Sequence, residues 1–318
     1  MKKFLFLVNP VSGKSAGKLM MEMILSEIKA LFAHDQFDIA LTRQDIASQV
    51  REVSEQYEAV VAVGGDGTLS PVVQEVAKLE HKPKVGLVPI GTGNDFALSL
   101  GIMQVLEQWG LKSLLKMVLR GNTRPIDIIG LSQSRIWTNY VGIGCDAKVS
   151  NDFNRLRGIG LLRSGFMKHF NKMFYVLIGL KNMFYRLPFD VELNYRDESS
   201  QTQSLAVPRG TLGIILSNVM TYAGGALLSS NGSLHDGKFE VTVIPGLREW
   251  IMLHCTRFFK RPLNLLCPGI LQVQTDRLEM CFSGETFYQV DGEIFDEPSG
   301  QKICLVMEVK GRVDIIAP

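Results

Sequence analysis

Residues 60–69, VVAVGGDGTL, constrain the fold more than any other stretch of this sequence. Four apolar residues, which suit a buried strand, run directly into three glycines that surround one acid. The helix-like segment Leu69–Leu79 follows at once. Glycines alone would make a turn, but an acid in a turn that precedes a helix indicates that the turn holds something charged. The stretch predicts a strand–loop–helix unit with a ligand at its loop.

The first 124 residues repeat this alternation of apolar runs and helical periodicity. The apolar runs predict strands at Phe4–Val8, Phe37–Thr42, Ala59–Val63 and Val85–Pro89. The helical period of three and four predicts helices at Ala16–Ala33, Ile46–Glu55 and Leu69–Leu79. Such alternation is typical of a parallel sheet with helices on both faces. We therefore expect an α/β domain over residues 1–124.

Three glycine-rich turns fall at the carboxyl ends of these strands: Asn9–Gly17, Gly64–Thr68 and Gly91–Asn94. In open parallel sheets, ligands bind beyond the carboxyl ends of the strands. One binding site built from three loops is therefore expected.

After Arg124 the pattern changes to short β-branched or alternating runs separated by turn signals such as Asp236-Gly237 and Asp291-Gly292. The runs are Ile136–Val141, Phe189–Tyr195, Thr211–Ser217, Phe239–Ile244, Leu278–Phe282 and Ile303–Val309. They predict a mostly antiparallel β-sandwich domain over residues 125–318. Helical insertions are expected near residues 153–186 and 247–260.

Composition limits the class of protein. A chain of 318 residues is long enough for two domains. A net charge of +2 gives no argument for nucleic acid. The five cysteines, an odd number without CxxC spacing, predict a reduced cytosolic protein with neither a disulfide nor a zinc framework. They are Cys145, Cys255, Cys267, Cys281 and Cys304.

The N-terminal apolar run, Phe4–Val8, follows two lysines as in a signal peptide, but it ends after five residues. A signal peptide needs about 7–15. The best apolar run, Met173–Leu180, has eight residues, whereas a membrane span needs about 18. We expect neither a signal peptide nor a membrane span.

Two familiar phosphate loops do not fit. A Walker A loop ending at Gly13-Lys14-Ser15 would need glycine where Val8 stands, and in the other register Leu19 follows Lys18. The dinucleotide fingerprint fails because Phe96 stands where its third glycine belongs. The chain is expected to be neither a P-loop NTPase nor a Rossmann dehydrogenase.

The turn Gly64–Thr68 still suits a polyphosphate, because glycines let backbone N–H groups approach and a helix N-terminus adds positive charge. Asp66 would repel a phosphate directly, so it is expected to act through Mg²⁺ or a ribose hydroxyl. The segment Gly91–Asp95 offers a second such loop with a hydroxyl, an amide and an acid.

Together these motifs resemble those of the diacylglycerol kinase catalytic domain, which also marks the bacterial lipid kinases and the sphingosine and ceramide kinases. The resemblance rests on Asn9-Pro10-x-Ser12-Gly13, on GGDGT at 64–68 and on PIGTGNDFA at 89–97. It continues at Asn139, Gly142, Gly144, Asp146-Ala147, Gly224-Gly225, Asp236-Gly237 and Asp291-Gly292-Glu293. NAD kinases also carry GGDGT, so that loop alone would indicate only the wider superfamily.

The resemblance implies a nucleotide site between the two domains. The residues that would hold or border ATP are Asn9, Ser12, Lys14, Thr42, Gly64, Gly65, Asp66, Gly67, Thr68, Thr92, Asn94 and Asp95. Asp291 corresponds to the general base that takes the proton of the lipid hydroxyl. Glu293 would help Asp66 and Asp95 to organise metal and water. On residues alone, Asp291-Gly292 equally suits an ordinary hairpin turn.

The resemblance also implies a structural Mg²⁺ at Ser233, Asp236 and Lys238. Just upstream the chain departs from the family pattern, with Ser229–Ser233 in place of a proline-containing segment and His235 in place of a second acid. A plain turn at Asp236-Gly237 is the alternative.

Two acid-free segments combine basic and aromatic residues, which suits an anionic membrane surface. The segment from Phe153 to Phe189 holds seven basic residues: Arg155, Arg157, Arg163, Lys168, Lys172, Lys181 and Arg186. The second, Trp250–Thr275, holds Arg257, Lys260 and Arg261 beside Phe258 and Phe259. Helices packed on the sheet with solvated basic faces are the alternative. Nothing resembles an RNA-recognition signature.

The sequence as a whole predicts an ATP- and Mg²⁺-dependent lipid kinase that visits the cytoplasmic face of a membrane. Its acceptor would be a hydroxyl of diacylglycerol or a similar lipid, with no nucleic-acid partner and with a homodimer as an option. A NAD kinase relative and a non-catalytic nucleotide- or lipid-binding protein are the alternatives. The second of these would need a defective acid among Asp66, Asp95, Asp291 and Glu293, and all four are present.

Overall fold

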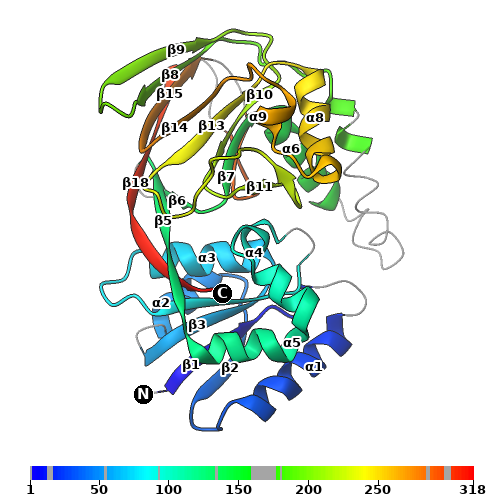
Figure 1. Cartoon of the computed structure of the whole chain (residues 1–318), viewed down its shortest axis with the longest axis vertical. Coiled ribbons are helices and arrows are strands. Elements are labelled where there is room, and N and C mark those ends of the chain that lie inside the picture. Colours follow the sequence, from blue (N-terminus) through cyan, green and yellow to red (C-terminus); the bar gives the residue numbers. More distant parts are fainter. Residues whose placement is uncertain are drawn as a thin grey trace.

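The computed structural model describes residues 2–12, 17–53, 56–91, 94–132, 135–158, 177–179, 181–283, 287–296 and 302–318. Figure 1 shows the N-terminal half of the chain below and the C-terminal half above. The long strand β18 (Lys302–Ile316) runs from one half to the other.

Four parallel strands make the N-terminal part of the larger sheet, in the order β2–β1–β3–β4. They are β1 (Lys2–Val8), β2 (Phe37–Leu41), β3 (Tyr57–Gly64) and β4 (Lys84–Pro89). The inner strands are continuous apolar runs because both faces of a parallel sheet are covered, and residues 4–8 and 59–63 are buried accordingly. The predicted parallel sheet is confirmed.

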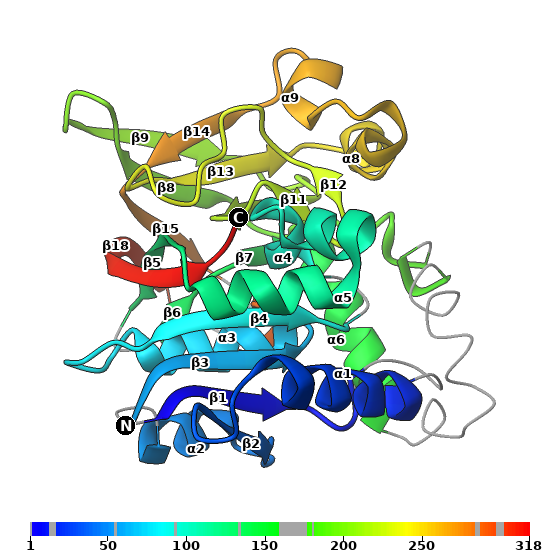
Figure 2. The ribbon, with the colours of Figure 1, turned by 60° about the horizontal axis from the view of Figure 1, so that its bottom comes forward.

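Five helices of the described chain accompany this sheet: α1 (Gly17–Leu31), α2 (Ile46–Val53), α3 (Asp66–Val76), α4 (Asp95–Ser99) and α5 (Ile102–Arg120). Figure 2 shows α1 and α5 together on the near face of the sheet and α3 behind it. The α4 and α5 helices were not predicted. The α3 helix begins at Asp66 rather than at Leu69, so the acid of the glycine-rich loop lies in the first turn of the helix.

The C-terminal half is an antiparallel sandwich, as predicted. Its smaller sheet has the order β14–β13–β10–β7–β16–β17. These strands are β7 (Tyr140–Gly144), β10 (Gly213–Ser217), β13 (Phe239–Ile244), β14 (Gln272–Thr275), β16 (Phe287–Val290) and β17 (Glu293–Asp296). The larger sheet supplies β5 (Thr123–Leu131), β6 (Arg135–Trp137), β8 (Val191–Arg196), β9 (Thr202–Val207), β15 (Arg277–Ser283) and β18. The apolar residues between the sheets form a second core, in which Trp137 packs edge-on against Phe239.

The strand predicted across residues 136–141 is wrong in one respect, because the structure divides it into β6 and β7. Thr138 and Asn139 leave the ladder between them. Their backbone N–H groups point instead at a carboxylate, that of Asp291. A long-range contact therefore interrupts a run whose sequence predicts one strand.

Strand β18 ties the two halves together. Its first part pairs with β15 in the sandwich, and near its end Ile315 pairs with Val85 of β4. Ile315, Ile316 and Ala317 are buried in the N-terminal core. The division at residue 124 stays a prediction, and the last residues of the chain pack with the N-terminal sheet.

The second predicted helical insertion is confirmed by α8 (Leu247–Phe259), which is followed by the short α9 (Leu263–Leu266). Within the first, α6 (Cys145–Gly158) is described, but residues 159–176 and 180 lie outside the described residues, and three of the seven basic residues, Arg163, Lys168 and Lys172, lie there. A two-stranded hairpin, β11 (Thr221–Tyr222) and β12 (Ala226–Leu227), lies beside α8.

Within the described part of the chain, no helix combines the length and the apolar character needed to cross a membrane.

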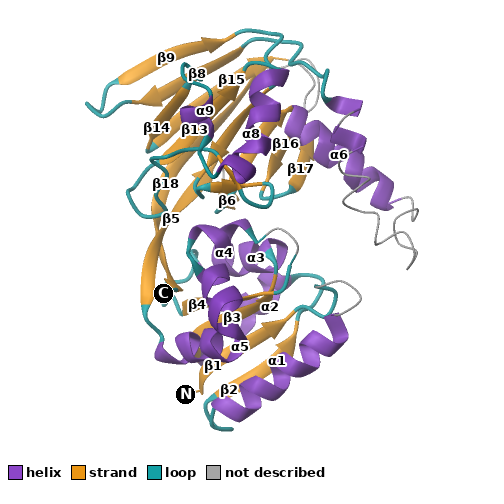
Figure 3. Cartoon of the chain, turned by 45° about the vertical axis from the view of Figure 1, so that its right-hand side comes forward, coloured by secondary structure: helices purple, strands orange, loops and turns teal. Residues whose placement is uncertain are grey.

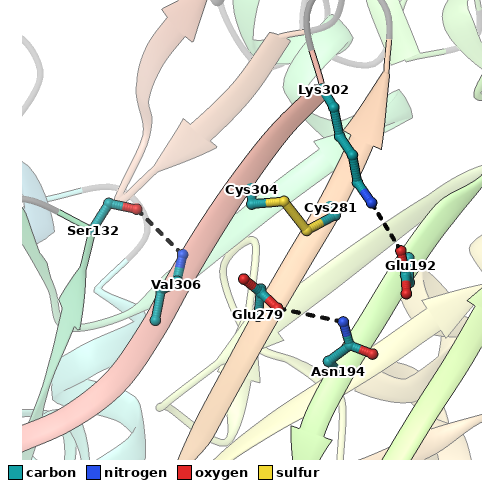
Figure 4. Close-up of a disulfide and its surroundings, with 8 residues drawn as sticks. All are labelled: Ser132, Glu192, Asn194, Glu279, Cys281, Lys302, Cys304 and Val306. Carbon is teal, nitrogen blue, oxygen red and sulfur yellow. Dashed lines mark hydrogen bonds and ion pairs between the residues drawn. A yellow bond between two sulfur atoms is a disulfide. The ribbon is translucent and has the colours of Figure 1, made fainter.

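The predicted absence of disulfides is wrong. Cys281 on β15 and Cys304 on β18 stand opposite each other and form a disulfide, with their Cα atoms 4.1 Å apart (Figure 4). Sequence spacing could not reveal the pair, because the register of two strands brings together cysteines separated by 23 positions. Cys145, Cys255 and Cys267 are free.

Candidate active site

The predicted loops gather where the two halves of the chain face each other, with α3 and α4 at the top of the N-terminal half (Figure 3). Asn9 follows β1, and its side-chain amide donates to the Thr68 hydroxyl over 2.8 Å. The Thr42 N–H donates to the Val8 carbonyl, which places Thr42 beside the same loop. The Ser12 N–H closes the turn on the Asn9 carbonyl. Lys14 lies outside the described residues.

The two glycine-rich loops, after β3 and after β4, pack back to back. A Cβ on Gly65 would lie 2.9 Å from the Gly91 Cα, and a Cβ on Gly91 would lie 2.7 Å from the Asn94 Oδ1. Either distance is too short for a side chain, so glycine is required for this approach. Gly67 has open space around it and is not required on this ground. Thr92 and Gly93 lie outside the described residues.

Asp66 connects the two loops. Its carboxylate accepts the Asp95 N–H at 2.8 Å and the Phe96 N–H at 3.4 Å, which are the first amides of α4. The Asp95 carboxylate in turn accepts the N–H groups of Gly224 and Gly225 at 2.8–3.0 Å. The sequence thus placed both acids in one site, and the structure adds that a glycine pair from the C-terminal half holds Asp95.

Asp291 lies in the turn between β16 and β17, with a positive φ of 49°. Its Oδ1 accepts the N–H groups of Asn139 at 2.8 Å and Tyr140 at 3.1 Å. Its Oδ2 accepts the N–H and the hydroxyl of Thr138 at 3.0 and 3.1 Å. Asp291-Gly292 does form the two-residue turn of the β16–β17 hairpin, as the alternative expects. Its carboxylate is nevertheless held by groups of Thr138, Asn139 and Tyr140 rather than left in solvent.

The α3 helix brings the N-terminal loops to Asp291. The Gln74 side-chain amide donates to the Asp291 Oδ2 at 3.2 Å, and the Ser70 hydroxyl lies 3.1 Å from the Thr138 hydroxyl. Sequence reasoning missed Ser70, Gln74 and Thr138. The spacing held a signal, because Asp66, Ser70 and Gln74 recur every four residues and so share one face of α3.

A second polar chain supports the Asp291 turn from behind. The Gly292 N–H donates to the Gln289 Oε1 at 2.8 Å, and the Gln289 amide donates to Asp146 at 2.9 Å. Tyr222 donates its hydroxyl hydrogen to the other oxygen of Asp146. All three side chains are buried, so the chain Tyr222–Asp146–Gln289 fixes the turn by satisfied hydrogen bonds.

Neighbouring carboxylates raise the affinity of Asp66 for a proton. Burial, together with the negative charge of Asp95 and, less strongly, of Asp291, raises the pKa of Asp66 to about 6. Burial also raises the pKa of Asp95 and of Asp291, although the N–H groups that each accepts oppose the rise. Asp95 is buried, and Asp66 and Asp291 are half-buried. Carboxylate oxygens are the donors that Mg²⁺ prefers, so Asp66 and Asp95 fit a magnesium ion. Among the described residues, the buried oxygens Asn94 Oδ1 and Asn139 Oδ1 have no hydrogen-bond partner.

Glu293, the other predicted catalytic acid, begins β17 and is exposed. Its backbone pairs with Val290 of β16, and its side chain has no hydrogen bond or ion pair with another residue that the structure describes. Its predicted role in the metal network therefore stays a prediction.

The predicted structural metal loop lies away from these acids. The Asp236 carboxylate accepts only the Lys238 N–H among described donors, at 3.0 Å, and the Ser233 hydroxyl faces the N–H of His235. Arg312 of β18 donates to the buried Asp127 at 2.8 Å and to the His235 carbonyl at 2.9 Å. The Arg312 guanidinium therefore already supplies a positive charge at this loop. The metal assignment of Ser233, Asp236 and Lys238 stays a prediction.

Comparison with known proteins defines the class. A model of the diacylglycerol kinase catalytic domain matches residues 3–131, and a model of the diacylglycerol kinase accessory domain matches residues 136–294. The chain belongs to the diacylglycerol kinase family. It is a lipid kinase by family, an enzyme that phosphorylates an alcohol acceptor.

Individual relatives agree with this assignment. The chain is 24% identical over 298 residues to the diacylglycerol kinase of Bacillus subtilis (strain 168), covering 92% of this chain and 90% of the relative. It is 25% identical over 319 residues to the diacylglycerol kinase of Staphylococcus carnosus (strain TM300), covering 100% and 95%. A crystal structure described as a diacylglycerol kinase from Bacillus anthracis str. Sterne shares the fold, with a TM-score of 0.70, 21% identity and coverage of 100% and 97%.

Proposed function

We propose that this protein transfers the γ-phosphoryl group of ATP to a hydroxyl of diacylglycerol or a similar lipid. The observation that carries the proposal is the position of Asp291. A carboxylate from the C-terminal half is held against α3, the helix that begins at the glycine-rich loop of the N-terminal half. Donor and acceptor sites on opposite halves, with a base between them, suit an in-line transfer between two bound substrates.

In the proposed reaction the lipid hydroxyl oxygen attacks the γ-phosphorus, the bond from that phosphorus to the β,γ-bridging oxygen breaks, and ADP leaves. The hydroxyl proton passes to Asp291. Glycine N–H groups of the loop Gly64–Thr68, at the start of α3, would bind the phosphates. Mg²⁺, held by Asp66 and Asp95, would neutralise charge on the phosphates when bound.

Asp291 must free one lone pair before it can take a proton. A carboxylate has about four acceptor positions, and five donors already surround this one. The three backbone donors are fixed by β6 and β7. The Gln74 amide is a side-chain donor at the longest of these distances, 3.2 Å, so it is the group that an incoming lipid hydroxyl would displace.

The test is transfer of labelled γ-phosphate from ATP to mixed-lipid vesicles, with and without Mg²⁺. The Asp291→Asn variant serves as the inactive form, and Asp197→Asn, the same change in an exposed turn, serves as the control. Labelled phospholipid that requires both Mg²⁺ and Asp291 supports the proposal and identifies the acceptor. Labelled NADP formed from NAD, with no labelled lipid, would replace it with the NAD kinase reading.

A further inference from the structure

The α8 helix presents apolar side chains to solvent. Leu253 and Thr256 are buried against the β11–β12 hairpin and its surroundings, but the opposite stripe carries Ile251 and Phe258, which are 48% and 79% exposed. Phe259 at the end of the helix is 59% exposed, and Leu265 of α9 is 60% exposed. A surface helix of a globular protein normally turns polar residues outward, so these four residues form an apolar surface that no described residue of the chain covers.

Basic residues accompany the exposed phenylalanines, whereas the acid of α8, Glu249, lies in the first turn of the helix. Arg257, Lys260 and Arg261 are exposed beside the two phenylalanines, and the sequence has no Asp or Glu from Trp250 to Thr275. None of the three makes an ion pair with a residue that the structure describes. Exposed aromatic side chains surrounded by unpaired cations are complementary to the interface of an anionic bilayer.

The same helix contacts the candidate active site. The Thr256 hydroxyl accepts the Leu227 N–H at 2.8 Å, and Arg257 donates to the Ala223 carbonyl at 3.3 Å. These contacts hold the hairpin whose Gly224 and Gly225 N–H groups bind Asp95. In Figure 1 the C-terminal end of α8 is directed toward α4, the helix that Asp95 begins.

We propose that Ile251, Phe258, Phe259 and Leu265, with Arg257, Lys260 and Arg261, form a docking surface for an anionic phospholipid bilayer. The apolar side chains enter the interface and the cations bind phosphate headgroups. Docking brings the Asp95 side of the active site to the membrane, where a lipid acceptor is found. The proposal that these residues bind a bilayer rests on the exposed surface alone. The proposal that docking serves catalysis rests on the proposed function.

Binding is measured by flotation with phosphatidylcholine vesicles, with and without phosphatidylglycerol. Phe258→Ser with Phe259→Ser is expected to weaken binding at least about tenfold on both vesicle types, because two large apolar side chains no longer enter the interface. Lys260→Gln with Arg261→Gln is expected to weaken binding only to the phosphatidylglycerol vesicles. The α5 helix supplies matched controls: Trp109→Ser, an aromatic side chain that is 64% exposed, and Lys112→Gln with Lys116→Gln, all expected to bind like the wild type.

Three outcomes overturn the proposal: wild-type protein that does not float with either vesicle, α8 variants that bind like the wild type, or α5 variants that lose binding equally. A wild-type dimer that the phenylalanine variant converts to monomer also overturns it, because a second copy would then cover the surface. If the phenylalanine variant does not fold by circular dichroism, the Lys260 and Arg261 variant decides, since it changes only exposed side chains.

Activity separates this proposal from the proposed function. With diacylglycerol in detergent micelles, the α8 variants are expected to keep wild-type activity, and with diacylglycerol in anionic vesicles they are expected to lose it in proportion to binding. Vesicle binding that depends on α8 in a protein that phosphorylates no lipid would leave the docking surface standing and remove the proposed function.

Discussion

Two Asp-Gly turns of this chain, Asp291-Gly292 and Asp236-Gly237, have the same local sequence and different surroundings. Asp291 has a positive φ, and its carboxylate accepts hydrogen bonds from Thr138, Asn139, Tyr140 and Gln74. The Asp236 carboxylate accepts only the N–H of Lys238, two residues away, among the donors that the structure describes. Distant elements therefore hold the Asp291 carboxylate, whereas the Asp236 carboxylate contacts only its own turn.

The largest expected effect is on the rate of phosphoryl transfer, which should depend on Asp291 and not on Asp236. Asp291→Asn should reduce phosphoryl transfer about a hundredfold to ten-thousandfold, because an amide cannot accept the hydroxyl proton. Asparagine tolerates the left-handed backbone at this position, so the fold and ATP binding should persist. Initial rates and ATP binding are measured for this variant and for Asp236→Asn. Equal losses in the two variants, or a nearly active Asp291→Asn protein, would contradict the assignment of the base.

The second effect concerns the stability of the chain segment that carries each turn. The Cys281–Cys304 disulfide closes a loop that carries Asp291, and nothing comparable encloses Asp236. Cys304→Ser should lower the free energy of unfolding by about 3 kcal/mol, the amount expected from loop entropy for a closure of this length. Urea denaturation with and without dithiothreitol measures it, with Cys255→Ser as the control for a free thiol. A wild-type protein that is insensitive to the reductant and as stable as Cys304→Ser would show that the bond does not stabilise the fold.

The acids near Asp291 give a pH dependence, as do Asp236 and its neighbour Glu240, whose pKa values burial also raises. The pKa of Asp66 is about 6 in the folded chain against an ordinary 3.8, because of burial and of Asp95. The folded state therefore binds this proton more tightly than the unfolded state. The contribution of Asp66 to the free energy of unfolding is highest below about pH 4 and falls as the pH rises through about 6.

Asp66→Asn removes this loss, so without divalent ions at pH 7 the variant should be more stable than the wild type by about 3 kcal/mol. Mg²⁺ should stabilise the wild type and not the variant. Urea midpoints at several pH values, with and without Mg²⁺, measure the difference, and Asp197→Asn is the control. The same pH dependence in the wild type and in Asp66→Asn would refute the proposed cause.

A smaller effect tests the contact between Asp291 and Gln74 of the N-terminal half, which Asp236 lacks. Gln74→Ala removes a donor to the carboxylate, so the pKa of Asp291 should rise and the acid limb of kcat/KM should move to higher pH by roughly half a unit. A pH–rate profile measures the shift, and Gln108→Ala, an exposed position on α5, is the control. An unchanged acid limb would mean that Gln74 does not act on the base.

The smallest effect belongs to the Asp236 turn. Asp236→Asn should change the free energy of unfolding by less than about 0.5 kcal/mol, because one local N–H contact is lost and Arg312 still binds the neighbouring Asp127. Thermal unfolding with and without Mg²⁺ checks this. A Mg²⁺-dependent stabilisation that disappears in this variant would instead support the metal site at Ser233, Asp236 and Lys238.

Local patterns predicted much of the N-terminal half. Apolar runs such as residues 59–63 make buried strands wherever helices cover both faces of a sheet, and glycine loops at strand ends lie at one edge by topology. Asp66 and Asp95 could therefore be placed in one site before the fold was known. The resemblance to a family added Asp291, whose local sequence equally suits a hairpin turn.

Long-range packing decided the rest. The register of β15 and β18 created the disulfide, and the crossing of β18 placed Arg312 on Asp127. The breaks at Thr138 and Asn139 and the contact of Gln74 with Asp291 depend on elements more than a hundred residues apart. A sequence determines periodicity and loop chemistry, because these depend on neighbours in the chain. Which buried groups meet is determined only when the two halves pack, because the hydrogen bonds of a buried carboxylate must be satisfied by whatever the fold brings to it.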